Sequence, residues 1–168
     1  MTEPPTQASA DCPVLLTIPV QWGDQDAFGH VNNTRSIRWF ETARMDYFDL
    51  DPIVELLQGT RVGPILVSIH CDYCQQLSHP DTVQVTARIK KIGRTSMMME
   101  HQIFSQQQQT LISEGYSTIV LFDYAKNEPL PVSEELRAVI ETLEGRAIDD
   151  DLFDPRDRSG KVRQQKYW

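Results

Sequence analysis

Two aspartates precede a segment with helical periodicity, at a spacing that could serve acyl-transfer chemistry. Asp24 and Asp26 lie in a loop, and Asn32 or Asn33 is suited to cap the helix that follows. A helix N-terminus carries a partial positive charge and free N–H donors, which can hold a carbonyl oxygen as it becomes an oxyanion. A carboxylate beside it can attack the carbonyl carbon or activate water. The stretch is therefore a candidate hydrolytic site, although such residues are also common cap and turn formers.

The helix that would carry this N-terminus is expected from about Asn33 to about Leu50. It should stop before Asp51, because a residue that precedes proline avoids helical geometry. A short further turn of helix is expected at 53–58. Apolar residues at spacings of three and four form one stripe of the long helix, namely Ile37, Phe40, Ala43, Tyr47 and Phe48. The extended run 14–22 precedes the loop, and Pro19 within it indicates an edge strand or a bulge.

Four more extended segments follow, at residues 65–73, 83–92, 96–104 and 111–124. Alternation in the first places Ile65, Val67 and Ile69 on one face. Clean alternation in the first three of these segments, joined by short turns, predicts an antiparallel meander, and the apolar run 119–122 predicts that the last segment is central in the sheet. A second helix is expected at 133–143, with Ser133 as its N-cap. One long helix and five strands predict an α+β domain in which the sheet covers the helix.

Several strings resemble one family. G-D-Q-D-A-F-G-H-V-N-N at 23–33 and R-W-F-E-T-A-R at 38–44 look like the signature of the hotdog-fold acyl-CoA thioesterases of the 4-hydroxybenzoyl-CoA thioesterase type. The likeness continues in D-Y-C-Q-Q-L, K-K-I-G-R-T-S-M and V-L-F-D-Y followed by P-L-P, and so covers about residues 14–137. The resemblance implies a five-stranded antiparallel sheet wrapped around one long central helix, with a short C-terminal helix. It also implies an acyl-CoA substrate, no metal or organic cofactor, and a homodimer or tetramer.

The resemblance also implies roles for particular residues. Asp26 would be the catalytic carboxylate, as general base or as nucleophile, and the backbone N–H of Asn33 would polarise the thioester carbonyl. The loop residues expected at the substrate are Gly29, His30, Val31 and Asn32, with His30 mainly shaping the loop. Because the family's site lies at a subunit interface, the pocket of a partner would be walled by Val67, Ser68 and Ile69. Ser36 stands where many relatives carry tyrosine, and this difference bears on the shape of the acyl pocket.

A basic cluster lies at the expected hairpin near residue 93. It consists of Lys90, Lys91, Arg94, Thr95 and Ser96. In a chain of net charge −8, a polyanion such as coenzyme A needs a local basic patch, so this cluster is a candidate site for its phosphates. A solvated hairpin tip is an equally good interpretation. Asp24 is expected to stabilise the turn, Glu41 to pair with Arg44, and two strand histidines, His70 and His101, to be structural.

Length, composition and charge limit the classes of protein to which the chain can belong. The 168 residues suit one domain, expected at 13–144 between a flexible segment 1–12 and a charged tail 145–168. Net acidity argues against nucleic-acid or anionic-membrane binding. Residues 1–11 lack the features of a secretory signal, so a cytoplasmic location with reduced cysteines is expected. Cys71 and Cys74 form a lone C-x-x-C in a strand, which favours packing over metal binding.

Two alternatives to an acyl-CoA thioesterase remain open from the sequence. One is a thioesterase that acts on acyl groups carried by an acyl carrier protein, in which case the basic cluster would bind an acidic protein surface. The other is a module on the same fold that binds acyl-CoA without turnover. The acyl group itself is not specified by the sequence.

Overall fold

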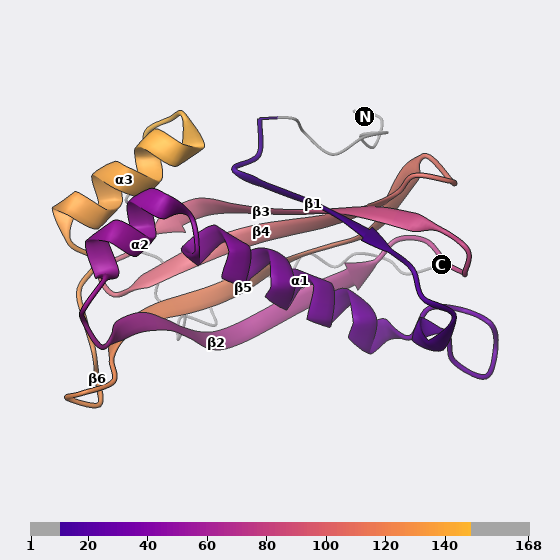
Figure 1. Cartoon of the computed structure of the whole chain (residues 1–168), viewed down its shortest axis with the longest axis horizontal. Helices are drawn as coiled ribbons and strands as arrows, with labels where there is room; N and C mark the ends of the chain where they lie inside the picture. The colour runs from indigo at the N-terminus through magenta and orange to yellow at the C-terminus, as the bar shows by residue number, and fades with distance from the viewer. Residues whose placement is uncertain (1–10, 149–168) are drawn as a thin grey trace, which may run out of the picture.

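The computed structural model describes residues 11–148 of the chain. Most of the expected N-terminal segment 1–12 and of the expected tail 145–168 lies outside these residues. The described part is a curved antiparallel sheet with one long helix, α1, lying along one of its faces (Figure 1). This is the α+β arrangement expected from the sequence. The elements are β1 (Val14–Pro19), η1 (Trp22–Asp24), α1 (Asn33–Phe48), α2 (Asp51–Leu57), β2 (Val62–Tyr73), β3 (Thr82–Ile92), β4 (Ser96–Ser105), β5 (Thr110–Asp123), β6 (Glu128–Pro129) and α3 (Glu134–Glu144).

The strand order is β1-β3-β4-β5-β2, and the two-residue β6 pairs with β5. The predicted antiparallel meander is confirmed for the consecutive strands β3, β4 and β5, but β2 pairs with β5 at the far edge and not with its sequence neighbour β3. Pro19 ends β1 at an edge of the sheet, as a residue without a backbone N–H should. The first strand is therefore shorter than the predicted run 14–22, because Trp22 to Asp24 form the turn of 3-10 helix η1. β5 is an interior strand, although β4 is the middle one.

A bulge in β2 corrects the predicted alternation of that strand. Leu66 pairs with Ile119, whereas Ser68 pairs with Thr118, so Val67 is an extra residue without a partner. Directly paired residues share a face of the sheet. Ile65 therefore lies on the opposite face from Ile69, and Val67 is 52% exposed at the edge.

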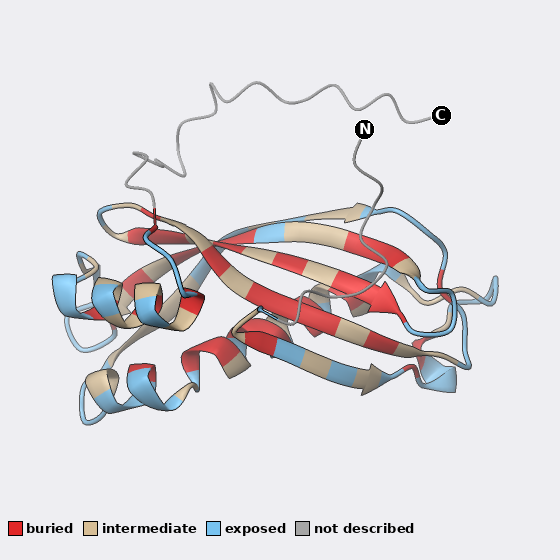
Figure 2. Cartoon of the chain, turned by 90° about the horizontal axis from the view of Figure 1, so that it is seen from above, coloured by how far each residue is buried: buried red, intermediate tan, exposed pale blue. Residues whose placement is uncertain are grey.

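Helix α1 begins at Asn33 because the side chain of Asn32 accepts a hydrogen bond from the Thr34 N–H, at 3.0 Å. The helix ends at Phe48, two residues before the predicted end, and α2 begins at Asp51. The buried residues of α1 are Ser36, Trp39, Phe40, Ala43, Arg44, Tyr47 and Phe48. Figure 2 shows buried residues along the strands of the sheet as well. Ile37, predicted in the apolar stripe of α1, is only partly buried.

Close packing fixes α1 against the middle of the sheet. The Phe40 ring stacks on the His101 imidazole with ring centroids 4.7 Å apart. A Cβ atom at Gly115 would lie 2.0 Å from the His70 carbonyl oxygen, so only glycine fits there. On β4, the alternate residues Met97, Met99, His101 and Ile103 are all fully buried.

The C-terminal helix α3 is tied to the rest of the fold by one buried carboxylate. Ser133 caps this helix as predicted. Glu144, at its other end, accepts hydrogen bonds from the Tyr47 hydroxyl at 2.9 Å and from the Ile89 N–H at 2.5 Å. It also pairs with Arg88 at 3.3 Å. Burial, and then the nearby Glu144 carboxylate, raise the pKa of Tyr47, which therefore stays a neutral donor.

Candidate active site

The loop between β1 and α1 is folded back onto the start of the helix. The Asp24 carboxylate accepts a hydrogen bond from the Gln21 N–H at 2.8 Å and pairs with Arg35 of α1 at 3.1 Å. The Asn32 N–H donates to the Asp24 carbonyl at 2.9 Å. These contacts connect both ends of the loop to the first turn of α1. Asp24 is buried and has the turn-stabilising role expected from the sequence.

Asp26 lies within a tight turn of this loop. Its Oδ1 atom accepts from the Phe28 N–H at 2.8 Å, and its backbone N–H donates to the His30 carbonyl at 2.8 Å. Gly29 completes the turn with a φ of 80°, a conformation that side chains rarely adopt. Within residues 11–148, the second carboxylate oxygen has no protein partner. One carboxylate oxygen is thus held by the backbone, and the other is available to a ligand.

The helix start next to this carboxylate offers a free donor. The Asn32 side chain occupies the Thr34 N–H, but the N–H of Asn33 has no acceptor among the described residues. The carbonyl of Asn33 accepts from the Tyr73 hydroxyl at 3.0 Å, which fixes the first turn of α1 against the end of β2. The Asn33 N–H therefore combines an unused donor with the positive end of the helix dipole.

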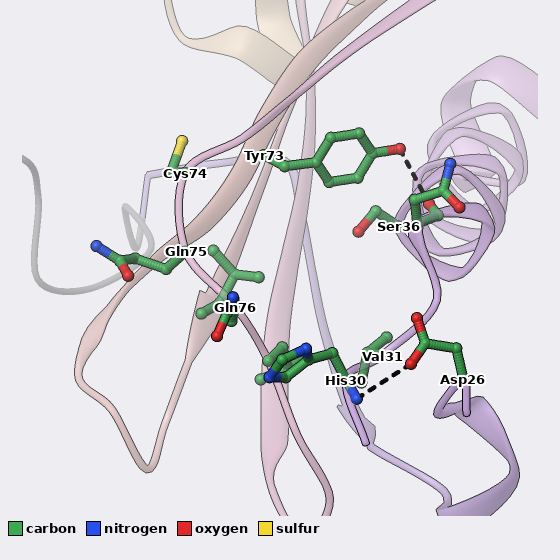
Figure 3. A pocket seen from close by; sticks show the side chains of 11 residues that line it. Asp26, His30, Val31, Ser36, Tyr73, Cys74, Gln75 and Gln76 are labelled. Carbon is green, nitrogen blue, oxygen red and sulfur yellow. Dashed lines mark hydrogen bonds between the residues drawn. The ribbon is translucent and has the colours of Figure 1, made fainter. Parts of the chain in front are cut away.

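A cavity of about 480 Å³ joins these groups. Four of the predicted catalytic and substrate-binding residues line it: Asp26, His30, Val31 and Asn33. Figure 3 shows the Asp26 carboxylate and the His30 backbone on one side, with Tyr73 reaching toward α1 above them. The other lining residues are Ser36, Tyr73, Cys74, Gln75, Gln76, Leu77 and Ile112. A carboxylate, a free helix-terminal N–H and a cavity between them are the elements that hydrolysis of an activated carbonyl requires.

Two other predicted loop residues support the site without lining the cavity. Gly29 and Asn32 do not line the cavity, but their turn and cap hold Asp26 and Asn33 in place. Three predicted residues of β2 also lie outside it. Ile69 lines a separate cavity between α1 and β2, and Val67 and Ser68 are exposed on the edge strand.

The basic cluster lies far from Asp26 within one chain. β1 ends at the register pair Pro19–Thr82, at the start of β3, whereas the cluster spans the other end of β3 and the turn into β4. The Arg94 carbonyl accepts from the Val132 N–H at 2.8 Å, which places the hairpin beside the segment before α3. Lys90 pairs with Glu100 at 3.5 Å. A single chain does not bring Lys90, Lys91, Arg94, Thr95 or Ser96 to the cavity.

Several cavity residues were not identified from the sequence. Tyr73 is the last residue of β2, the segment 74–77 begins the connection to β3, and Ile112 belongs to β5. The string D-Y-C-Q-Q-L marks part of this connection, but no spacing relates it to Asn33, forty residues earlier. One expected helix pair is also corrected, because Glu41 binds Arg38, while Arg44 is buried and contacts Ser117.

Neither the cysteines nor the strand histidines add a reactive group to the cavity. Burial raises the pKa of both Cys71 and Cys74, so these thiols are poor nucleophiles at neutral pH. Both cysteines are free, and no group of three potential metal ligands occurs within residues 11–148. His101 is buried in the core with its Nε2 atom 2.9 Å from the Ser117 hydroxyl. His70 pairs with Asp72 at 3.0 Å on the outer face of β2.

Comparison with known proteins decides the family. A family model described as the thioesterase-like superfamily matches residues 20–140. The chain belongs to the thioesterase-like superfamily. As expected from its sequence, it is a thioester hydrolase with the hotdog fold. Within residues 11–148, no helix has the length and apolar character that a membrane crossing needs.

Individual relatives cover most of the domain. The PA2801 protein of Pseudomonas aeruginosa is 34% identical, with a TM-score of 0.66 over 75% of this chain and 96% of that one. A thioesterase from Thermus thermophilus, solved with coenzyme A and zinc, is 28% identical with a TM-score of 0.72 over 83% of this chain and all of that one. The long-chain acyl-CoA thioesterase FadM of Escherichia coli is 21% identical over 118 residues, which are 70% of this chain and 89% of FadM.

Proposed function

We propose that this protein hydrolyses acyl-CoA thioesters to a free acid and coenzyme A, with Asp26 as the catalytic carboxylate. The observation that carries the proposal is the cavity that Asp26 and Asn33 both line, the first with a carboxylate and the second with an unpaired N–H at the helix start. The coenzyme A complex of the Thermus thermophilus relative and the names of FadM and of the acyl-CoA thioesterase YbgC of Haemophilus influenzae support coenzyme A as the carrier.

In this mechanism the thioester carbonyl oxygen accepts a hydrogen bond from the Asn33 N–H, which stabilises the oxyanion that forms as the carbonyl carbon is attacked. Asp26 takes a proton from water, and the resulting hydroxide adds to the carbon. The C–S bond then breaks, and the leaving thiolate receives the proton. In the alternative route, the Asp26 carboxylate attacks the carbon directly, the thiolate leaves, and water hydrolyses the mixed anhydride.

Coenzyme A is larger than the cavity and carries several negative charges, so its nucleotide must bind outside it. The basic cluster of Lys90, Lys91, Arg94, Thr95 and Ser96 is our candidate for the phosphates. Since one chain holds this cluster at the opposite end of the sheet, the proposal requires a homodimer or tetramer that brings a second copy to the cavity. The exposed edge strand β2, with Val67, Ser68 and Ile69, is our candidate for the neighbouring wall.

The test is hydrolysis of a panel of acyl-CoA esters, with the released thiol as the readout. We expect the wild type to be active and the Asp26→Asn variant to lose about a thousandfold or more in kcat, because the amide can neither accept a proton nor attack. The matched control is Asp49→Asn, a change at an exposed aspartate beyond the other end of α1. It should leave kcat within about twofold of the wild-type value.

Other outcomes would favour other functions. Near-normal turnover by a folded Asp26→Asn variant would remove Asp26 from the mechanism. Faster cleavage of acyl groups on an acyl carrier protein than on coenzyme A would favour the carrier protein as substrate. Binding of acyl-CoA by calorimetry, without thiol release by the wild type, would indicate a binding module.

A further inference from the structure

The cavity has a buried end and an open end. Its most buried lining residues are Ser36, Leu77 and Ile112, each less than 5% exposed, whereas Cys74, Gln75 and Gln76 are exposed. If the protein acts on acyl-CoA as proposed above, the charged coenzyme A portion must extend into solvent through the open end of the cavity. The acyl group then occupies the buried end, next to Ser36.

Ser36 places a single free hydroxyl at the buried end of the cavity. Leu77 and Ile112 are apolar, and the Ser36 hydroxyl has no hydrogen-bond partner among the described residues, although the residue is only 4% exposed. Because Ser36 lines the cavity, its unpaired hydroxyl is open to that space and is suited to bind a polar group of a ligand.

Tyr73 supplies a second hydroxyl on the facing wall. Figure 3 shows its ring directed at the first turn of α1, beside Ser36. The Tyr73 hydroxyl donates its proton to the Asn33 carbonyl at 3.0 Å, so its oxygen, which also lies beside the Cys71 thiol, can act as an acceptor. Ser36 can still donate. Together the two side chains offer one donor and one acceptor, which a ligand hydroxyl satisfies and a ligand keto group, an acceptor only, does not.

We propose that Ser36 and Tyr73 form a recognition site for a hydroxyl on the acyl group, so that the preferred substrates are hydroxyacyl thioesters. Ser36 follows Asn33 by three residues, or about 4.5 Å along the helix axis at the usual rise. The carbonyl oxygen is bound at Asn33. The hydroxyl is therefore expected on about the third carbon of the acyl group, with the carbonyl carbon counted as the first.

The experiment compares kcat/KM for 3-hydroxyoctanoyl-CoA, 3-oxooctanoyl-CoA and octanoyl-CoA. We expect the wild type to prefer the hydroxy ester over octanoyl-CoA by about tenfold or more, because octanoyl-CoA leaves the Ser36 hydroxyl unpaired. The oxo ester should fall between the two. In Ser36→Ala the preference should shrink toward one, whereas Ser36→Thr, which keeps the hydroxyl, should retain most of it. Tyr73→Phe should reduce the preference for the hydroxy ester over the oxo ester.

Thr42→Ala is the matched control, since it removes an exposed α1 hydroxyl that binds only the Arg38 carbonyl. It should preserve the wild-type ratio. Equal kcat/KM for hydroxy and plain esters, or an unchanged ratio in Ser36→Ala, would overturn this inference while leaving the proposed function intact. No thiol release from any ester by the wild type would overturn the proposed function itself, and this inference with it.

Discussion

The hydrogen-bond donor offered by Asn33 belongs to the main chain, so most substitutions of the side chain should leave it in place. Proline is the exception, because it has no N–H. It is also well tolerated at the first position of a helix. The preceding Asn32 has a φ of −61° and a ψ of 137°, which is the conformation that a following proline prefers. Position 33 therefore allows a single donor to be removed with little change to the fold.

We expect Asn33→Pro to lower kcat by about a hundredfold to a thousandfold, the usual effect of losing an oxyanion donor. Asn33→Ala, which keeps the N–H, should stay close to the wild type. Thiol release gives kcat, and a thermal unfolding curve of each variant checks that the helix start is intact. Comparable activity in the proline and alanine variants would show that this N–H does not bind the carbonyl.

At the scale of elements, local patterns predicted nearly every helix and strand. Alternation defined β3 and β4, a long apolar run marked β5, and the caps at Asn32 and Ser133 were visible as residue types. The bulge at Val67 was not predictable, because an extra apolar residue preserves an apparently regular pattern. The residues of the site also differ in how far the sequence could predict that they lie together. Asp26 and Asn33 lie within one local stretch, whereas Tyr73 and Ile112 reach the cavity only through strand pairing.

The contact between α1 and β4 has a pH-dependent consequence. Burial, and then the charge of Arg44, lower the pKa of His101 from 6.5 to about 3. In the unfolded chain this imidazole binds a proton as the pH falls through about 6.5. The unfolded state then holds more protons than the folded state between these two values. The neutral His101 imidazole of the folded state thus contributes stability that is fully present above pH 6.5 and is lost as the pH falls toward 3.

We therefore expect the free energy of unfolding to decrease by about 4 kcal/mol from this group as the pH is lowered through that window. In His101→Gln, which cannot be protonated but can still bond to Ser117, the dependence should be flatter. Urea unfolding at several pH values measures this. His70→Gln, on the exposed outer face, serves as the control and should keep the wild-type slope. Parallel curves for His101→Gln and the wild type would contradict the prediction.

At the scale of the whole molecule, the two edges of the sheet are unequal. β1 has six residues and ends in a proline, which disfavours further pairing. β2 has twelve residues and exposes Leu66 and Val67. A long edge with apolar side chains is the better surface for a second copy of the chain, and it borders the cavity through Tyr73.

Val67→Lys should accordingly weaken self-association, because it places a charge in the proposed interface, and should lower turnover with it. Leu15→Lys puts the same charge at a 40% exposed position on the other edge and should affect neither. Sedimentation velocity over a range of concentrations measures the assembly, alongside thiol release. A Val67→Lys variant that assembles like the wild type would exclude β2 as the contact.

The carboxylate of Glu144, in α3, binds Tyr47 of α1 and Ile89 of β3. These two residues precede Glu144 by 97 and 55 positions in the chain. Such distant partners meet only after the intervening loops have closed. As the chain leaves the ribosome, the helix and the sheet can begin to assemble before this residue is available. The C-terminal helix is thus expected to dock last. A chain truncated before this helix should be an early target for proteases and chaperones.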